Sequence, residues 1–156
     1  MLSLLVFTLI NGLAASSGAV NQPGDWYERL EKPDWTPPNW AFPVVWSTIF
    51  ILNIIAGWLV WRTSGSAAWL AMAFYGFNLV VNAVWSFLFF GRRRMDWALI
   101  DAGILLASVV AVMMAFASHS SLAAILLTPY LAWVAIAFGL NWKMVQLNPE
   151  YARSRA

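Results

Sequence analysis

The chain alternates between long apolar runs and short polar breaks. Apolar runs lie near residues 2–20, 42–61, 67–90, 95–117 and 122–145. About 20 apolar residues cross the hydrocarbon core of a bilayer, so each run is long enough for one crossing. A helix satisfies its own backbone hydrogen bonds, which a segment in lipid must do. The pattern therefore predicts a single-domain, all-α membrane protein built as a bundle of five transmembrane helices.

The polar breaks predict how these helices are connected. The second to fifth runs are separated only by "RTSGS", "GRRR" and "SHSS". Connections this short make neighbouring helices antiparallel. The connection at 21–41 is the only long one, and loops of that length in compact domains are usually functional.

The sequence of the long loop, "DWYERLEKPDWTPPNW", predicts ordered local structure. The stretch from Asp25 predicts a short helix that ends before Pro33, and Pro37-Pro38 predict a stiff, extended segment. The loop is rich in aromatic residues, namely Trp26, Tyr27, Trp35 and Trp40. Two interpretations stay open at this point: an aromatic belt at the membrane surface, or a lid that packs over a cavity.

Composition confirms the membrane class and narrows the chemistry. The chain of 156 residues is 62% hydrophobic and only 10% charged, whereas soluble domains carry about 25% charged residues. It has no cysteine, which excludes disulfides, thiolate metal ligands and thiol nucleophiles. His119 is the single histidine and has no acidic partners nearby in the sequence, so we expect no metal site. No phosphate-binding loop and no nucleophile–base–acid set is present.

The basic residues predict the orientation in the membrane. With five crossings, one side holds only Arg62, and the other holds Arg29, Lys32, Arg92, Arg93, Arg94, Lys143, Arg153 and Arg155. The positive-inside rule then places loop 21–41 and the C-terminus in the cytoplasm. Because a helical bundle is typical of a bacterial inner membrane, we expect that membrane rather than the outer one. No Lys or Arg precedes the first run, which favours a retained helix over a signal peptide. The "RRR" turn fits lipid headgroups and not nucleic acid.

Four of the predicted helices place tryptophan beside a polar group on one face. These sets are Trp46 with Asn53; Asn78 and Asn82 with Trp85; Trp97 with Asp101, toward which one of Arg92–Arg94 can reach; and Tyr130, Trp133, Ala137, Leu140 and Asn141. Asparagine alone is also typical of hydrogen bonds between membrane helices. Its pairing with tryptophan favours a cavity for a flat, apolar ligand with a weakly polar edge.

The motifs resemble one known family along nearly the whole chain. "WYERLEKPDWTPPNWAFPVVW", "NAVWSFLFFG", "MDWALID" and "PYLAWVAIAFGLN" occur in the order and at the spacing of the TspO/translocator protein family. Its members are also known as tryptophan-rich sensory proteins or peripheral-type benzodiazepine receptors, and this chain resembles a bacterial one. Asn78 stands where the family often has Gln. Trp142 stands where its sterol motif has Tyr, which speaks against sterol binding.

The resemblance implies a five-helix homodimer with a pocket beneath the first loop and no covalent cofactor. Family members bind porphyrins such as protoporphyrin IX, sterols and benzodiazepine-like ligands. By position, the resemblance implies pocket residues Tyr27, Pro37, Trp46, Asn82, Trp85, Trp97, Trp133, Ala137 and Leu140. The same loop and faces add Trp35, Pro38, Asn78 and Tyr130 to the predicted ligand-binding set.

The sequence therefore predicts a membrane receptor or carrier for porphyrins, with a role in tetrapyrrole sensing or regulation. The partners we expect are the ligand, the bilayer and a second copy of the chain. One alternative is light-dependent protoporphyrin IX oxidation, for which the resemblance implicates Trp46 and Trp133. Another is transport of porphyrin or sterol, although no broken helix typical of transporters is predicted from the sequence.

Overall fold

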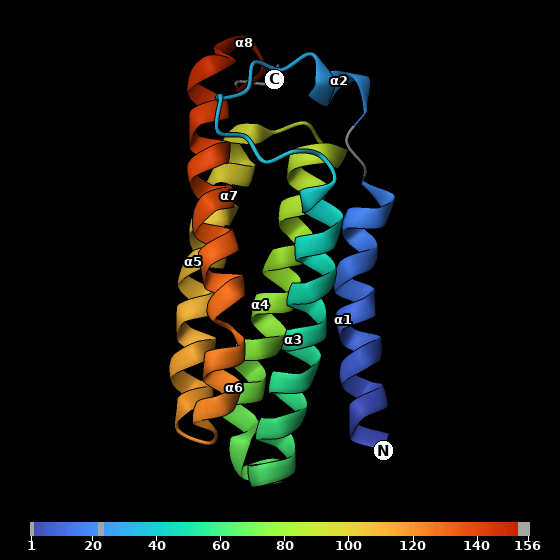
Figure 1. The fold of residues 1–156 in the computed structure, drawn as a ribbon, viewed down its shortest axis with the longest axis vertical. Helices are drawn as coiled ribbons and strands as arrows, with labels where there is room; N and C mark the ends of the chain where they lie inside the picture. Colours follow the sequence, from blue (N-terminus) through green and yellow to red (C-terminus); the bar gives the residue numbers. More distant parts are fainter. Residues whose placement is uncertain (1, 22–23, 153–156) are drawn as a thin grey trace.

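A computed structural model describes residues 2–21 and 24–152. Every regular element in this part of the chain is helical. The elements are α1 (Leu2–Val20), α2 (Asp25–Glu28), α3 (Ala41–Ser64), the 3₁₀ helix η1 (Gly65–Ala68), α4 (Trp69–Ser86), the π-helix η2 (Phe87–Gly91), α5 (Met95–Ala117), α6 (Ser121–Leu126), α7 (Thr128–Leu147) and α8 (Pro149–Ala152). Figure 1 shows the long helices side by side, with α2 and α8 at the end opposite the start of α1.

The long helices provide enough apolar length for five membrane crossings. The described residues contain four stretches that are long and apolar enough to span it: Leu2–Val20, Ala41–Gly91, Met95–Ala117 and Ser121–Leu147. Ala41–Gly91 has 51 residues, which is more than twice one crossing. It reverses at Gly65, whose φ of 53° favours glycine, so α3 and α4 run in opposite directions (Figure 1). The predicted fold class, an all-α membrane protein, is confirmed.

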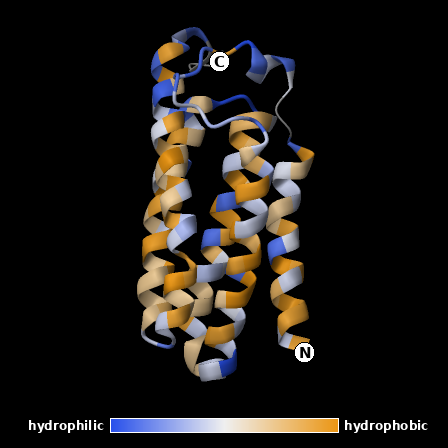
Figure 2. Cartoon of the chain, viewed as in Figure 1, coloured by the Kyte–Doolittle hydropathy of each residue, from blue (hydrophilic) through white to orange (hydrophobic). Residues whose placement is uncertain are grey.

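The hydropathy of the residues changes along the axis of the bundle. Figure 2 shows mostly hydrophobic residues along the long helices, whereas hydrophilic residues gather at the end that carries α2 and α8. The basic residues of the "RRR" turn lie at this end; Arg153 and Arg155 lie outside the described residues. The loop and the C-terminal end of α7 therefore share one side of the membrane.

The packing order of the helices leaves one interface loose. α1 packs against both α3 and α4, and α5 packs against both α4 and α7. The ring closes through α6, which packs firmly on α3, whereas α7 touches α3 only slightly. Because α7 continues from α6 toward the loop, α3 and α7 diverge beneath the loop.

The last crossing is not the single helix predicted for 122–145. It breaks at Leu127, between α6 and α7. Pro129 is the physical cause, because it has no N–H to donate to the carbonyl four residues earlier. Leu127 instead donates to the Ala124 carbonyl over three residues, at 3.1 Å. The irregularity is confined to one residue, and Ser121–Leu147 is still one stretch long enough to cross the membrane.

Buried polar groups tie α1 to the bundle. Asn11 Nδ2 donates to the Tyr75 hydroxyl at 2.6 Å, and that hydroxyl donates to the Asn53 carbonyl at 3.0 Å. This chain joins α1, α4 and α3. Polar bonds between helices are one of the few forces that hold helices together in lipid, so the first apolar run is an integral part of the bundle.

Gly57 on α3 lets α1 approach closely. A Cβ here would lie 2.8 Å from a ring carbon of Phe7 and 3.2 Å from Tyr75. Phe7 is buried and packs edge-to-face on Tyr75, so its ring has little room to move. Gly57→Ala should therefore destabilise the protein by about 1–2 kcal/mol, the cost of overpacking less the gain in helix propensity.

Thermal unfolding in detergent, followed by circular dichroism, checks this. Gly76→Ala in α4 is the matched control, because nothing lies within 4 Å of its added Cβ. It should leave the midpoint unchanged or raise it. Equal midpoints for the two variants would contradict the close packing of α1.

Candidate functional site: a cavity beneath the first loop

The loop packs onto the bundle through the aromatic residues of α2. Trp26 and Tyr27 are buried. The Tyr27 ring meets the rings of Phe89 and Phe90 edge-to-face, with centroids 6.3 and 5.6 Å apart. Trp26 also meets Phe89, at 6.0 Å. The α2 half of the loop therefore packs as a cover over the bundle. Trp40, at the other end of the loop, is 69% exposed, which fits a residue of an aromatic belt at the membrane surface.

The π-helix η2 makes this docking possible. A π turn inserts an extra residue into an α-helix, and such turns are frequent at functional sites. Here it brings the adjacent residues Phe89 and Phe90 against the same ring of Tyr27. Phe89 also stacks on Trp85, one turn earlier, with centroids 5.1 Å apart. The end of α4 thus forms an aromatic wall under the loop.

A small cavity lies between this wall, the loop and α7. Its lining is aromatic and aliphatic with one amide: Tyr27, Phe42, Trp85, Phe89, Phe90, Ala137, Leu140, Asn141 and Met144. The centre of a water molecule can occupy a volume of about 20 Å³ in this cavity. That is on the order of the space needed by one water molecule. This arrangement, with the loop packed down and the cavity nearly filled, is called the closed form below.

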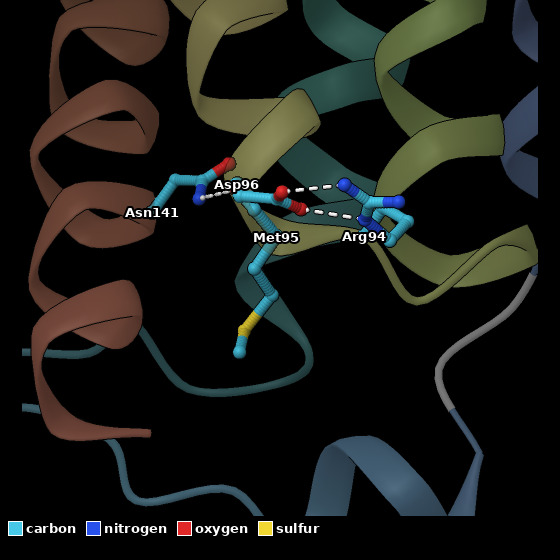
Figure 3. Close-up of polar contacts among 4 residues, drawn as sticks. All are labelled: Arg94, Met95, Asp96 and Asn141. Atoms are coloured by element: carbon cyan, nitrogen blue, oxygen red, sulfur yellow. Dashed lines mark hydrogen bonds and ion pairs between the residues drawn. The ribbon is translucent and has the colours of Figure 1, made fainter. Parts of the chain in front are cut away.

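Asn141 supplies the polar edge of the cavity and orients its wall. Its Oδ1 accepts from Trp85 Nε1 at 3.2 Å, and its Nδ2 donates to the Met95 carbonyl at 3.0 Å. Figure 3 shows Asn141 reaching Met95 at the start of α5. One buried amide on α7 therefore fixes the Trp85 ring and ties α7 to α5.

The "RRR" turn engages a different acid from the one expected. Arg94 Nε and Nη2 donate to the two carboxylate oxygens of Asp96, at 2.8 and 2.6 Å (Figure 3). These bonds raise the pKa of Arg94. Asp101 is buried, and its Oδ2 finds no hydrogen-bond partner within residues 2–21 and 24–152. Within the described residues, none of Arg92–Arg94 forms an ion pair with Asp101, and Arg94 pairs with Asp96, which lies closer along the chain.

Tyr27 contributes a neutral phenol to the cover. Burial, and then the neighbouring Glu28 carboxylate, raise the pKa of Tyr27. Lys32 Nζ lies 4.6 Å from the centre of its ring, in the geometry of a cation–π contact. The ring therefore combines an apolar face toward the cavity wall with a cation beside it.

Trp133 carries an unused hydrogen-bond donor. Its side chain is 9% exposed, and its Nε1 has no hydrogen-bond partner among the described residues. Its ring meets the ring of Phe42, a cavity wall, with centroids 5.5 Å apart. Ala137, one turn away on α7, also lines the cavity. A buried indole N–H usually finds an acceptor, so this donor marks the place where an acceptor is missing.

Trp46 lies one turn below Phe42 on α3 and is half-buried. Its ring meets Tyr130 edge-to-face at 6.2 Å and Phe50 at 5.8 Å. Trp46 belongs to the same packed cluster as Phe42 and Trp133. Trp46 therefore packs behind the cavity wall in the closed form and does not line the cavity itself.

Three predicted site residues bind helices together instead. Asn82 Nδ2 donates to the Tyr130 hydroxyl at 3.0 Å, and Tyr130 donates to Asn78 Oδ1 at 3.2 Å. Asn78 Nδ2 donates to Ser108 at 2.9 Å. The space beside Asn78 and Tyr130 has no room for water. For Asn78, Asn82 and Tyr130, the structure supports the interpretation as contacts between α4, α5 and α7.

Four other predicted residues lie away from the cavity. Trp97 is 56% exposed and lies beside Arg94, whose guanidinium is 5.5 Å from its ring centre. It does not line this cavity, because α5 turns the face with Ala98 and Ala102 inward, and its place in a ligand site stays a prediction. Trp35 is half-exposed and lies over Gly139 on α7. Pro37 is partly buried and Pro38 exposed, and neither lines the cavity.

The cavity thus gathers Tyr27, Trp85, Ala137 and Leu140 from the predicted set. Residues outside that set complete it: Phe42, Phe89, Phe90, Asn141 and Met144. Helical spacing carried a signal for most of them, because Phe42, Phe89 and Met144 each lie four positions from Trp46, Trp85 and Leu140. Phe90 had no such signal, since it depends on the π turn.

The fold and the covered aromatic cavity define an integral membrane protein with a candidate site for a small apolar ligand. Residues 2–147 match the TspO/MBR family, and the chain belongs to that family. It is 38% identical to the tryptophan-rich sensory protein of Cereibacter sphaeroides, over 97% of this chain and 95% of that one. It is 37% identical to the translocator protein of Bos taurus, over 91% and 88%. It is 35% identical to the tryptophan-rich protein TspO of Chlorobaculum tepidum, over 94% and 98%.

Proposed function

We propose that this protein is a membrane receptor or carrier that binds porphyrins, such as protoporphyrin IX, in the cavity beneath its first loop. The sensory and translocator names of its relatives support a role in sensing or moving a ligand. The observation that carries the proposal is the combination of an aromatic-walled cavity with the unpartnered Trp133 indole beside it.

The chemistry of a porphyrin matches this combination. Its large planar ring stacks on aromatic side chains, and offset or edge contacts of this kind contribute about 0.5–1.5 kcal/mol each. The rings of Tyr27 and Trp85 face the cavity from two sides of it, the loop and α4. A pyrrole nitrogen or a carboxylate oxygen can accept the hydrogen bond that Trp133 Nε1 leaves unmade.

Cations at the loop end match the two carboxylates of such a ligand. Lys32 lies on the Tyr27 ring, and Arg93 lies 6.0 Å from the Trp26 ring centre. Arg29 is exposed on the same loop. A charge-assisted hydrogen bond to a carboxylate is about twice as strong as a neutral one. A porphyrin with its ring inside and its carboxylates at the loop would satisfy both parts of the site.

Binding requires the closed form to open. Room for about one water compares with roughly 300–1,000 Å³ for sites that hold drug-sized ligands. α3 and α7 diverge beneath the loop, and the side chains that fill this space, Phe42 and Trp133, belong to the proposed site. Displacement of the loop and of Phe42 would join the cavity to Trp133 and Trp46.

We also propose that the loop faces the cytoplasm from a bacterial inner membrane. The loop end of the bundle carries most of the Lys and Arg residues, and the opposite end carries Arg62. The positive-inside rule assigns the more basic side to the cytoplasm.

Quenching of tryptophan fluorescence by protoporphyrin IX tests the binding proposal. The double variant Trp46→Phe with Trp133→Phe should weaken affinity by roughly tenfold, because it removes the unpartnered Trp133 donor and reduces two aromatic surfaces. The control is Trp69→Phe, since Trp69 is 68% exposed at the opposite end; its affinity should equal that of the wild type. Unchanged affinity in the double variant would show that porphyrin binds elsewhere.

Cysteine labelling tests the orientation, because the natural chain has no cysteine. Asn39→Cys lies on the loop and Ser66→Cys in η1, and both positions are exposed. In intact cells with a permeable outer membrane, an impermeant maleimide should label Ser66→Cys and spare Asn39→Cys until the inner membrane is opened. The reverse pattern would refute the proposed orientation.

A further inference from the structure

Loop 24–40 is joined to the bundle by one polar side chain, that of Asn148. The Glu31 N–H donates to Asn148 Oδ1 at 2.8 Å, and Asn148 Nδ2 donates to the Glu31 carbonyl at 2.9 Å. Within the described residues, these are the only hydrogen bonds between loop 24–40 and the helices beyond its junction with α3. Asn148 is 2% exposed.

The sequence places and holds this amide. Residues before proline avoid the helical region, and Asn148 precedes Pro149, so α7 ends at Leu147. The Asn148 N–H and Nδ2 both donate to the Met144 carbonyl, at 3.0 and 2.9 Å. The side-chain amide therefore uses its acceptor once and each of its two hydrogens once. Aspartate keeps the acceptor but lacks both side-chain donors, and alanine lacks all three side-chain bonds.

The other contacts of the loop with the bundle are of a different kind. Trp26, Tyr27 and Leu30 are buried in an apolar cluster with Phe89 and Met144. Apolar contacts have no direction, and a flat apolar ligand can replace them. The Asn148 bonds fix the loop in one position, and a ligand in the cavity cannot replace them.

These bonds can also break without trapping an unpaired group. The Glu31 side chain is exposed, so its N–H and carbonyl meet water once the loop lifts. The closed cavity holds about one water, so a larger ligand enters or leaves only after the loop has moved. The Asn148–Glu31 pair therefore lies on the path of ligand exchange.

We propose that Asn148 is the positioning residue that holds loop 24–40 closed over the cavity and sets how fast a ligand enters and leaves. The part that concerns ligand exchange rests on the proposed porphyrin binding. The part that concerns the loop stands on the hydrogen bonds alone.

Two measurements on Asn148→Ala and Asn148→Asp test the proposal. The first is the dissociation rate of protoporphyrin IX from the full chain in detergent, by stopped-flow tryptophan fluorescence. It should rise roughly tenfold or more in both variants, as expected for the loss of one or two hydrogen bonds. The second is hydrogen exchange of the Glu31 amide without ligand, which should accelerate by a similar factor while amides within α5 do not change.

Gln146→Ala is the matched control, because Gln146 is exposed near the same helix end and, within the described residues, its side chain bonds only Lys143, at 3.5 Å. It should leave both rates unchanged. If Asn148→Ala does not fold, as judged by circular dichroism, Asn148→Asp retains the side-chain volume and the acceptor for Glu31 and decides the outcome.

The two proposals fail in different ways. If the wild type does not bind protoporphyrin IX, the proposed function fails, and the Glu31 amide alone decides whether Asn148 holds the loop. If the protein binds porphyrin but both variants release it at the wild-type rate, control of exchange by Asn148 is overturned. Unchanged exchange of the Glu31 amide in both variants overturns the role of Asn148 in holding the loop.

Discussion

Hydrogen bonding between buried side chains determines how these helices meet. Lipid offers no partner to an amide or a phenol, so a polar group inside the bundle is stabilised when it bonds a neighbouring helix. Asn11, Asn78, Asn82 and Asn141 do so through Tyr75, Ser108, Tyr130 and Trp85. These bonds fix which faces of α1, α4, α5 and α7 lie inward, and the tryptophan positions follow from them.

The same requirement separates the site from the scaffold. Asn78, Asn82 and Tyr130 satisfy one another and leave no room for water, so they form a rigid layer in the middle of the membrane. Above that layer the side chains are aromatic, the packing between α3 and α7 is loose, and the Trp133 indole lacks an acceptor. A cavity beneath a cover arises there because apolar rings can be displaced at low cost, whereas the bonded layer cannot.

The sequence predicted the membrane class, the helices and the position of the cover because these depend on long runs and on proline. It also predicted Tyr27, Trp85, Ala137 and Leu140 in the cavity wall. It could not separate asparagines that bond each other from those that face a cavity, since both lie on inward faces. It missed the break at Leu127 and the π turn at Phe87–Gly91, where local backbone geometry overrides the regular repeat. The sequence alone also could not decide whether Trp97 lies in the cavity wall, because tryptophan is equally suited to a pocket and to the membrane surface.

The indole N–H of Trp133 is the most direct probe of the central claim, that a flat ligand completes this site. Its NMR resonance in the ¹⁵N-labelled protein can be assigned by its loss in Trp133→Phe. On addition of protoporphyrin IX, the resonance should shift and its hydrogen should become protected from exchange, while the Trp69 indole stays unchanged. Uptake of protoporphyrin IX with no change at Trp133 would contradict the account.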